Sequence, residues 1–506
     1  MEIVYKQCAG IDVHKKNVVV CRMSRDAQGK LTHQTRTFGT MTQNILELGD
    51  WLSEAGVTHV AMESTGEYWK PIYNLLEGSF ELLLVNARHI KMVPGRKTDV
   101  VDAHWIADLL QHGLLRGSFV PPKDQRAMRD LTRHRSNFVR QRATVCNRIQ
   151  KLLEGANIKL ASVATDILGA SGRQMLNAIA CGEDDPKTLA AMAKGRLRDK
   201  DAALKLALEG RIQPHQRLLL RELLAQVVSL DHSIEVLTHS IEDLCRNDPR
   251  NGEGGNGEGG EDLNAKDLEE TPGAVSEASP TSYQAVPSPS HLDSRKELET
   301  GAIDKTTAKP IKVSLPPLGF GQAVALLMTM PGVGRSAAEI ILGEIGTNMY
   351  RFPSDRHLSS WAGVASGNNR SAGKILSGRT TYGNMALKIL LIQVALAAVR
   401  TKKGYLYAFF RRIASRRGTK KALMAVAHAM LVSIYHMLKN HQSYNDLGAD
   451  HFDSRNPEAV AKKLVKRIMT LGEEPAKLVV DALQRAGIQC APPQIPHQAL
   501  TQPISA

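Results

Sequence analysis

Four acidic residues in the first fifth of the chain have the types and positions that metal-dependent phosphodiester chemistry requires. Asp12 follows an apolar run, and Glu63 ends another. Asp99 and Asp102 lie three residues apart, about one helical turn. A carboxylate at the end of a buried strand is costly to bury unless it is paired or binds a metal. Mg²⁺ prefers oxygen ligands, so the four acids together predict a Mg²⁺ site for phosphodiester chemistry.

The elements that would position these acids form a predicted α/β domain over residues 1–115. Three early strands followed by helix, strand, helix, strand and helix is the order of a ribonuclease-H-like fold. Taken singly, each acid could equally be a surface residue, and Asp99 could cap the helix after Thr98. Hydrophobic periodicity predicts strands at residues 3–11, 18–23, 57–62 and 81–85 and helices at 42–55 and 99–112.

The charge of the chain favours polyanionic partners. Its 506 residues include 65 Lys and Arg against 51 Asp and Glu, a formal charge of +14. Nucleic acid is the first partner class to expect and an anionic membrane surface the second. No stretch approaches the roughly 20 apolar residues of a spanning helix, and no signal peptide is recognisable. Six scattered cysteines without a C-x-x-C pair favour reduced thiols in a cytoplasmic protein and argue against structural zinc.

A basic helical region is predicted over residues 116–246. Residues 116–151 contain ten Lys and Arg and two acids. Because a solvated helix usually mixes its charges, this excess favours nucleic-acid contact. The heptad-like leucines after residue 218 could form a coiled-coil arm for dimerisation or a helical hairpin within the monomer. The arginines that share one helical face are Arg126, Arg129, Arg133 and Arg140.

The rest of the chain divides into three parts. Residues 247–316 are acidic and rich in Gly, Pro, Ser and Thr, so they should form a disordered linker. Residues 317–447 read as a second, mostly helical domain. Residues 448–506 read as a tail with two short helices, at 457–469 and 475–486, and a disordered end.

The second domain contains three candidate nucleic-acid features. Pro331-Gly-Val-Gly334 lies between two helical patterns, the helix-hairpin-helix arrangement, in which Gly332 and Gly334 would let the backbone approach a phosphate. The alternative is an ordinary helix–helix turn. A Gly-rich polar loop contains Ser366, Ser371 and Ser377, any of which could be a nucleophile or a turn residue. A basic patch next to several aromatic residues fits phosphate contact with base stacking, or a solvated loop: Arg411, Arg412, Arg416, Arg417, Lys420 and Lys421.

Together these segments resemble one family, the DEDD transposases of bacterial insertion sequences (the IS-one-ten family), which are bridge-RNA-guided recombinases. The likeness covers both predicted domains in order, outside the linker, which is longer than the family's usual connection. In the N-terminal domain it lies in GIDVHK (10–15), MESTG (62–66) and KTDVVDA (97–103). In the C-terminal domain it lies in PGVG (331–334), Phe352, WAG (361–363), RSAGK (370–374) and KKA (420–422).

The resemblance implies roles for these residues. The family's acidic tetrad would be Asp12, Glu63, Asp99 and Asp102 in a RuvC-like domain that binds Mg²⁺. Its serine would be Ser371, flanked by Arg370 and Lys374, and would form a covalent 5′-phosphoserine bond with DNA. The implied partners are donor and target DNA, a noncoding bridge RNA and further copies of the chain, as a dimer or tetramer near the nucleoid, without a membrane.

Two competing hypotheses are compatible with the same residues. In the first, the chain is a metal-dependent nuclease such as a junction resolvase, in which the acids act alone and the serine is structural. In the second, it is a nucleic-acid-binding or regulatory protein whose site has decayed; the intact acidic set argues against this. Protein that remains bound to DNA under denaturing conditions separates the recombinase from the plain nuclease.

Overall fold

The fold is that of a computed structural model with two compact units, residues 1–126 and 127–506, which we consider separately. The structure describes residues 3–25, 30–86, 102–251, 315–367, 369–371, 374–454, 457–470, 477–479, 481–482 and 485. The predicted linker therefore lies largely outside the described residues, as do Asp99 and the end of the tail. The described cysteines are all free thiols.

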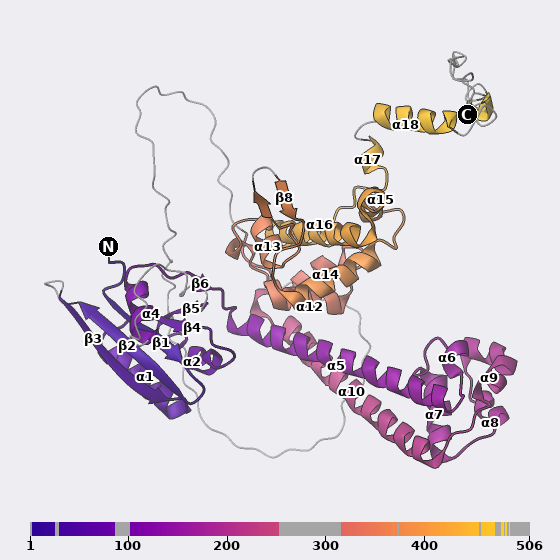
Figure 1. Ribbon diagram of the computed structural model, residues 1–506, viewed down its shortest axis with the longest axis horizontal. Helices are drawn as coiled ribbons and strands as arrows, with labels where there is room; N and C mark the ends of the chain where they lie inside the picture. The colour runs from indigo at the N-terminus through magenta and orange to yellow at the C-terminus, as the bar shows by residue number, and fades with distance from the viewer. Residues whose placement is uncertain are drawn as a thin grey trace, which may run out of the picture. The chain divides into compact units, whose positions relative to one another are not determined.

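The first unit is a mixed six-stranded sheet with helices on both faces (Figure 1). The strand order is β3-β2-β1-β4-β5-β6; β1, β2 and β3 pair in antiparallel fashion, and β4 and β5 run parallel to β1. The strands are β1 (Gln7–Val13), β2 (Asn17–Arg25), β3 (Leu31–Gly39), β4 (His59–Glu63), β5 (Glu81–Val85) and β6 (Gly117–Ser118). This mixed sheet is compatible with a ribonuclease-H-like domain.

The two faces of this sheet have separate hydrophobic cores. Helices α1 (Thr42–Glu54) and α2 (Trp69–Leu76) cover one face, where Ile11, Val20 and Met62 are buried. Helix α4 (Asp102–Gln111) covers the other face and packs on Cys8, Cys21 and Ala61. Because side chains alternate along a strand, each central strand contributes to both cores. The outer strand β3 is different, since most of its side chains are exposed.

The second unit begins with a long helical hairpin (Figure 1). Helices α5 (Lys123–Gly155) and α10 (Pro214–Arg246) form its arms, and each has 33 residues. Leu220, Leu224 and Val227 of α10 are buried in one core with Ile149 and Leu153 of α5. The leucine pattern thus serves a hairpin within the chain. The tip consists of α6 (Leu160–Val163), α7 (Ala170–Cys181), α8 (Pro186–Ala191), a 3₁₀ turn (Gly195–Lys200) and α9 (Asp201–Leu208).

The helices from α11 to α15 pack around α16 in a further hydrophobic core, which also contains Met128 of α5 and Ile241 of α10; α17 and α18 follow outside this core. The elements are α11 (Phe320–Met328), α12 (Arg335–Ile345), a 3₁₀ turn (Met349–Arg351), α13 (Asp355–Trp361), the strands β7 (Asn369–Ser371) and β8 (Lys374–Ser377), α14 (Met385–Ala398), α15 (Tyr405–Arg417), α16 (Thr419–Asn440), α17 (His451–Ser454) and α18 (Pro457–Met469).

Two details differ from the sequence-based expectations. By length and composition, α16 is apolar enough to cross a membrane, whereas no such stretch was expected from the sequence. Half of its apolar window is buried, as in the core helix of a soluble protein. The folded region also extends into the predicted linker. A 3₁₀ turn at Pro249–Asn251 follows α10, and the buried carboxylate of Asp248 accepts a hydrogen bond from the backbone N–H of Phe320 (2.7 Å).

Candidate functional site

Two of the predicted acids lie at the carboxyl ends of neighbouring parallel strands. Ile11 of β1 pairs with Met62 of β4, so the next residues, Asp12 and Glu63, are neighbours. Ile11 and Met62 face the core beneath α1 and α2, so by alternation both acids are on the face that α4 covers. The Glu63 carboxylate accepts a hydrogen bond from the Thr65 hydroxyl (3.2 Å). The structure thus has strands ending near both acids, as predicted, while the catalytic role of Asp12 and Glu63 stays a prediction.

A third acid, Asp102, is brought to the same face by close packing of α4. It is the first residue of α4, which packs on β1. The closest approach is at Gly10, where a Cβ atom would stand 2.3 Å from the carbonyl oxygen of Ala103. Only a residue without a side chain fits there, so Gly10 sets the depth of α4 and places Asp102 near Asp12.

The electrostatics of Asp12 reflect this neighbourhood. Its side chain is 14% exposed, and burial raises the pKa of its carboxyl group. His14 acts in the opposite direction, because its Nε2 atom lies 3.1 Å from the carboxylate, and the charge of Asp102 raises the pKa again. His14 belongs to the GIDVHK motif and had no predicted role, although its spacing two residues beyond Asp12 could have indicated one.

The donor set fits a divalent cation in its chemistry. Asp12, Glu63 and Asp102 offer only oxygen atoms, the ligands that Mg²⁺ takes, and a cation would relieve the repulsion between Asp12 and Asp102. Asp99 lies outside the described residues. Within the described residues, no group of three or more His, Cys, Asp or Glu side chains is close enough to hold a metal ion.

The predicted serine lies in a short antiparallel hairpin of the second unit. Ser371, the last residue of β7, pairs with Lys374, the first residue of β8, so it lies next to the turn. The side chains of Arg370, Ser371 and Lys374 lie outside the described residues, and their roles remain predictions. Ser366, the competing serine, is exposed and its backbone pairs with Thr380 below the hairpin.

The two predicted turn glycines have different surroundings. Gly332 has φ +82°, and a Cβ atom there would stand 2.5 Å from the backbone nitrogen of Ala398 in α14. Gly332 therefore allows the turn to pack closely against the backbone of α14. Gly334 precedes α12 as its N-cap residue, and nothing lies within 4 Å of a Cβ atom built there. The N-terminus of α12 is thus approachable at Gly334.

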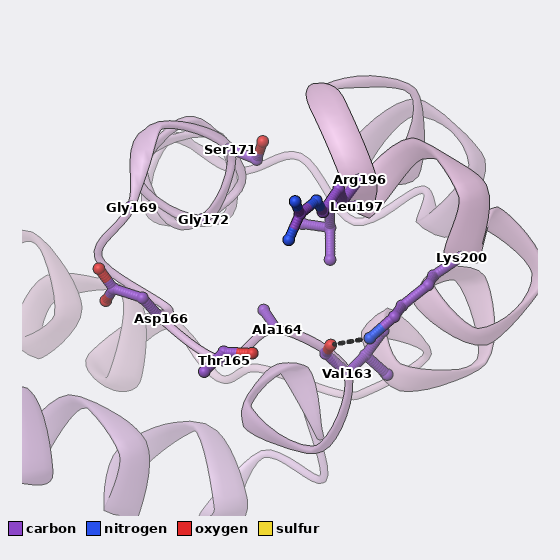
Figure 2. A pocket seen from close by; sticks show the side chains of 10 residues that line it. All are labelled: Val163, Ala164, Thr165, Asp166, Gly169, Ser171, Gly172, Arg196, Leu197 and Lys200. Carbon is purple, nitrogen blue, oxygen red and sulfur yellow. Dashed lines mark hydrogen bonds between the residues drawn. The ribbon is translucent and has the colours of Figure 1, made fainter. Parts of the chain in front are cut away.

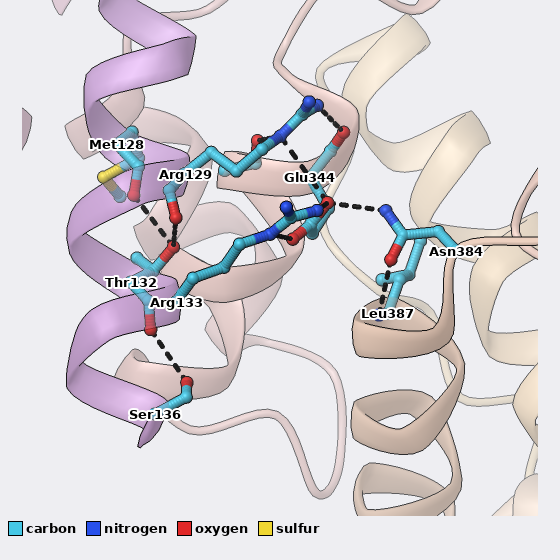
Figure 3. A network of polar contacts seen from close by, with 9 residues as sticks. Met128, Arg129, Thr132, Arg133, Ser136, Glu344, Asn384 and Leu387 are labelled. Atoms are coloured by element: carbon cyan, nitrogen blue, oxygen red, sulfur yellow. Dashed lines mark hydrogen bonds and ion pairs between the residues drawn. The ribbon is translucent and has the colours of Figure 1, made fainter. Parts of the chain in front are cut away.

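The basic face of α5 was interpreted from sequence as a nucleic-acid surface, and for three of its four arginines the structure gives another use. Arg126 forms an ion pair with Glu77 (2.6 Å). Arg129 and Arg133 hold the buried carboxylate of Glu344 (Figure 3). A buried carboxylate must be paired, so these charges serve the fold. Arg140 is exposed, and its predicted role stays open.

The predicted basic patch covers the end of α15 and the start of α16. All six of its side chains are exposed: Arg411, Arg412, Arg416, Arg417, Lys420 and Lys421. Arg412 lies over the ring of Phe452, 4.9 Å from its centroid. Tyr405 and Phe409 stack on each other and on the same ring, so these aromatics form their own cluster.

A cavity of about 330 Å³ opens in the tip of the helical hairpin (Figure 2). Arg196 and Lys200 come from the 3₁₀ turn before α9, and Asp166 and Ser171 come from the segment around the start of α7. Lys200 donates a hydrogen bond to the carbonyl oxygen of Val163 (3.1 Å). None of the residues predicted from sequence for catalysis or binding lines this cavity.

Two family models match the chain, and both describe transposases. A model of DEDD transposases of the IS110 family matches residues 9–158, which include the acidic set and the first arm of the hairpin. A model described as the IS116/IS110/IS902 family of transposases matches residues 324–411, which include the turn glycines and the serine hairpin. No curated protein gives a significant match. The chain belongs to the IS110 family of transposases, enzymes that cut and recombine DNA.

Proposed function

We propose that this transposase cuts and rejoins DNA through a covalent bond to Ser371, with Mg²⁺ held by the acidic tetrad. The observation that supports the proposal is the position of Asp12, Glu63 and Asp102 on one face of the sheet. Asp99, three residues before Asp102, would complete the ligand set. When bound, Mg²⁺ supplies charge stabilisation at the phosphate that reacts.

The covalent step is a phosphoryl transfer that conserves the energy of the DNA bond. The Ser371 oxygen forms a bond to the scissile phosphorus, and the bond from phosphorus to the 3′ oxygen breaks. The serine proton passes through solvent to the leaving 3′ oxygen, so the products are a 5′-phosphoserine and a 3′ hydroxyl. Attack by another 3′ hydroxyl reverses the step and rejoins the DNA. Arg370 and Lys374 flank the serine in sequence and would bind the phosphate.

Nucleic acid would contact several exposed cationic groups of the second unit. Arg140 on α5 and the α15–α16 patch (Arg411, Arg412, Arg416, Arg417, Lys420 and Lys421) are exposed and fit phosphate contacts. Gly334, with the N-terminus of α12, fits a further phosphate contact. We further propose that a noncoding bridge RNA selects donor and target DNA, and that the chain acts as a dimer or tetramer near the nucleoid.

The test uses the full chain, incubated with Mg²⁺ and a DNA duplex that carries the ends of its insertion element. The reaction is run with and without RNA transcribed from the noncoding flank of the element. A denaturing gel then shows whether protein remains attached to DNA. Wild-type protein and Ser366→Ala should give a protein–DNA adduct, and Ser371→Ala should bind DNA normally yet give none. An adduct with Ser371→Ala but not with Ser366→Ala would move the nucleophile to Ser366. Cutting without any adduct would favour the alternative, a metal-dependent nuclease.

A further inference from the structure

A buried carboxylate connects the first arm of the hairpin to the segment that carries the serine. Glu344, near the end of α12, has no exposed side-chain surface. Arg133 donates to both of its oxygens (2.6 and 2.9 Å), and Arg129 lies 3.5 Å from one of them. Arg129 also donates to the backbone carbonyls of Gly343 (3.1 Å) and Glu344 (2.7 Å). α12 is thus held on α5 through both its side chain and its backbone.

The same carboxylate also binds Asn384, which lies outside α5 and α12. The side-chain amide of Asn384 donates to Glu344 Oε2 (2.5 Å; Figure 3). The amide oxygen of Asn384 accepts from the backbone N–H of Leu387 (3.1 Å), which makes it the N-cap of α14. The two ends of one side chain therefore fix the start of α14 to Glu344.

Asn384 is also the residue at which the serine hairpin returns to the helical core. Its backbone N–H donates to the carbonyl oxygen of Trp361 (3.2 Å), the last residue of α13 before the hairpin. Just inside this point, a Cβ atom at Gly383 would stand 2.3 Å from the backbone nitrogen of Gly363. The segments that enter and leave the β7–β8 hairpin are therefore packed closely against each other, next to the point where Glu344 binds Asn384.

The pairing of these segments continues towards the hairpin. Thr381 donates its backbone N–H to the carbonyl oxygen of Ala365 (3.2 Å), and Gly367 donates to that of Arg379 (2.8 Å). β7 and β8 follow, with Ser371 next to the turn. A hydrogen-bonded ladder therefore connects Asn384 to the serine, and a shift at its base is carried to its tip.

We propose that Glu344, acting through Asn384, is a positioning residue for Ser371. This inference rests on the proposed role of Ser371 as nucleophile. Attack on phosphorus requires the serine oxygen to be in line with the leaving oxygen, and a displacement of about 1 Å can lower a rate by roughly 100-fold. The two arginines supply the opposite charge that a buried carboxylate needs, and their contacts fix the Glu344 side chain in place.

The decisive variant is Asn384→Ser. Serine is as good an N-cap as asparagine but is too short to reach Glu344, so α14 should persist while the link is lost. With the full chain, Mg²⁺ and the element-end duplex, the rate of adduct formation at saturating DNA should fall 10- to 100-fold. The DNA concentration at half-maximal rate should change less than twofold, a separation that general loss of structure would not produce.

A matched control and a rescue complete the experiment. Asp185→Ser makes the same kind of N-cap change on α8 at the hairpin tip, where Asp185 accepts from the backbone of Thr188 (2.9 Å), and should leave the rate unchanged. The double variant Glu344→Gln with Asn384→Asp exchanges the amide and the carboxylate between the two positions. It keeps an N-cap for α14 and a negative charge in the cluster. Its rate of adduct formation should be at least tenfold higher than that of Asn384→Ser.

The outcomes separate the two proposals. If Ser371→Ala forms an adduct, or if wild-type protein forms none, Ser371 is not the nucleophile. The positioning role of Glu344 is then refuted as well. If Ser371→Ala forms no adduct while Asn384→Ser reacts at the wild-type rate, the nucleophile stands and the positioning role is refuted. An equal loss of rate and DNA affinity in Asn384→Ser also refutes it. If Asn384→Ser does not fold, recovery by the double variant decides: wild-type-like reaction supports the link, and a folded but inactive double variant contradicts it.

Discussion

Gly10 and Ala103 approach so closely that a single added carbon on Gly10 would overlap the carbonyl oxygen of Ala103 at 2.3 Å. The contact joins the central strand β1 to the first turn of α4. Asp12 lies two residues beyond Gly10, and Asp102 lies immediately before Ala103. A packing contact between two residues without functional groups thus determines how near two acids of the candidate site lie to each other.

Gly10→Ala should therefore damage both stability and activity. The obstructing atoms belong to the helix backbone, Ala103 O and Ala107 N, and cannot rotate away. Overpacking of this kind costs about 1–3 kcal/mol, which urea denaturation would measure. DNA cutting should fall as α4 moves. Gly49→Ala is the matched control, because its nearest neighbour is a flexible Leu76 methyl at 3.3 Å; a similar loss there would contradict the explanation.

Asp12→Asn should stabilise the metal-free protein at neutral pH while abolishing DNA cutting. Because burial raises the pKa of Asp12 in the fold, its stabilising contribution exists below its ordinary pKa and is lost as pH rises through the raised value. At pH 7 the ionised, largely buried carboxylate lowers the free energy of unfolding, and the neutral asparagine side chain avoids this loss. The melting temperature of the variant should exceed that of wild type at pH 7, with the difference shrinking towards pH 4.

Adding Mg²⁺ at pH 7 should reverse the order of the melting temperatures, so that wild type melts above Asp12→Asn. Wild type should gain stability from the ion and the variant should gain much less, because it has lost a ligand. Asp50→Asn, at an exposed position of α1, serves as the control and should alter neither comparison. A variant that melts below wild type at pH 7 without Mg²⁺ would show that Asp12 is adequately paired by His14 alone.

Arg133 and Arg140, two helical turns apart on α5, should respond oppositely to replacement by alanine. Arg133→Ala leaves the Glu344 carboxylate buried with one arginine fewer and should cost roughly 2–3 kcal/mol. Arg140→Ala should stay within about 0.5 kcal/mol of wild type. Its effect should appear in DNA binding, as a weaker affinity and a salt dependence reduced by about one unit of slope. Unchanged binding would remove Arg140 from the proposed surface.

Gly332 and Gly334 form a second contrasting pair. Gly332→Ala meets both a positive φ and the backbone of α14, so it should cost more than about 2 kcal/mol. Gly334→Ala meets open space and should change stability by less than about 1 kcal/mol. If the turn binds phosphate, Gly334→Ala should still weaken DNA binding, measured by titration of a labelled duplex. Equal stability of the two variants would contradict the packing role of Gly332.

Much of the first unit could be predicted from sequence because its periodicities are local. The buried strands β1, β4 and β5 and the helix α1 follow runs of apolar residues, and the mixed sheet agrees with the predicted order. Asp248 could not be assigned to the fold in this way. Its burial depends on Phe320, far along the chain, while its own surroundings in sequence are polar.

The arginines of α5 show the same limit at the candidate site. Helical spacing correctly put Arg129 and Arg133 on one face but could not identify what that face contacts. Glu344 lies more than two hundred residues away, in the second half of a helix whose neighbouring residues there are apolar or glycine. A buried acid in such a helix was the available signal, because it requires a cationic partner somewhere in the fold. Asn384 gave a weaker signal, since asparagine before a helix is explained by capping alone.

The outer strand β3 bears on how the protein avoids aggregation. Among the described residues β3 pairs only with β2, so its other edge is a template on which a foreign strand could add. Its side chains are mostly polar and exposed, and Arg36 forms an ion pair with Glu47 of α1 (2.7 Å). An incoming strand would have to desolvate these groups without an apolar surface to bury in return. The exposed strand thus protects the sheet from edge-to-edge association, even though its backbone edge is open.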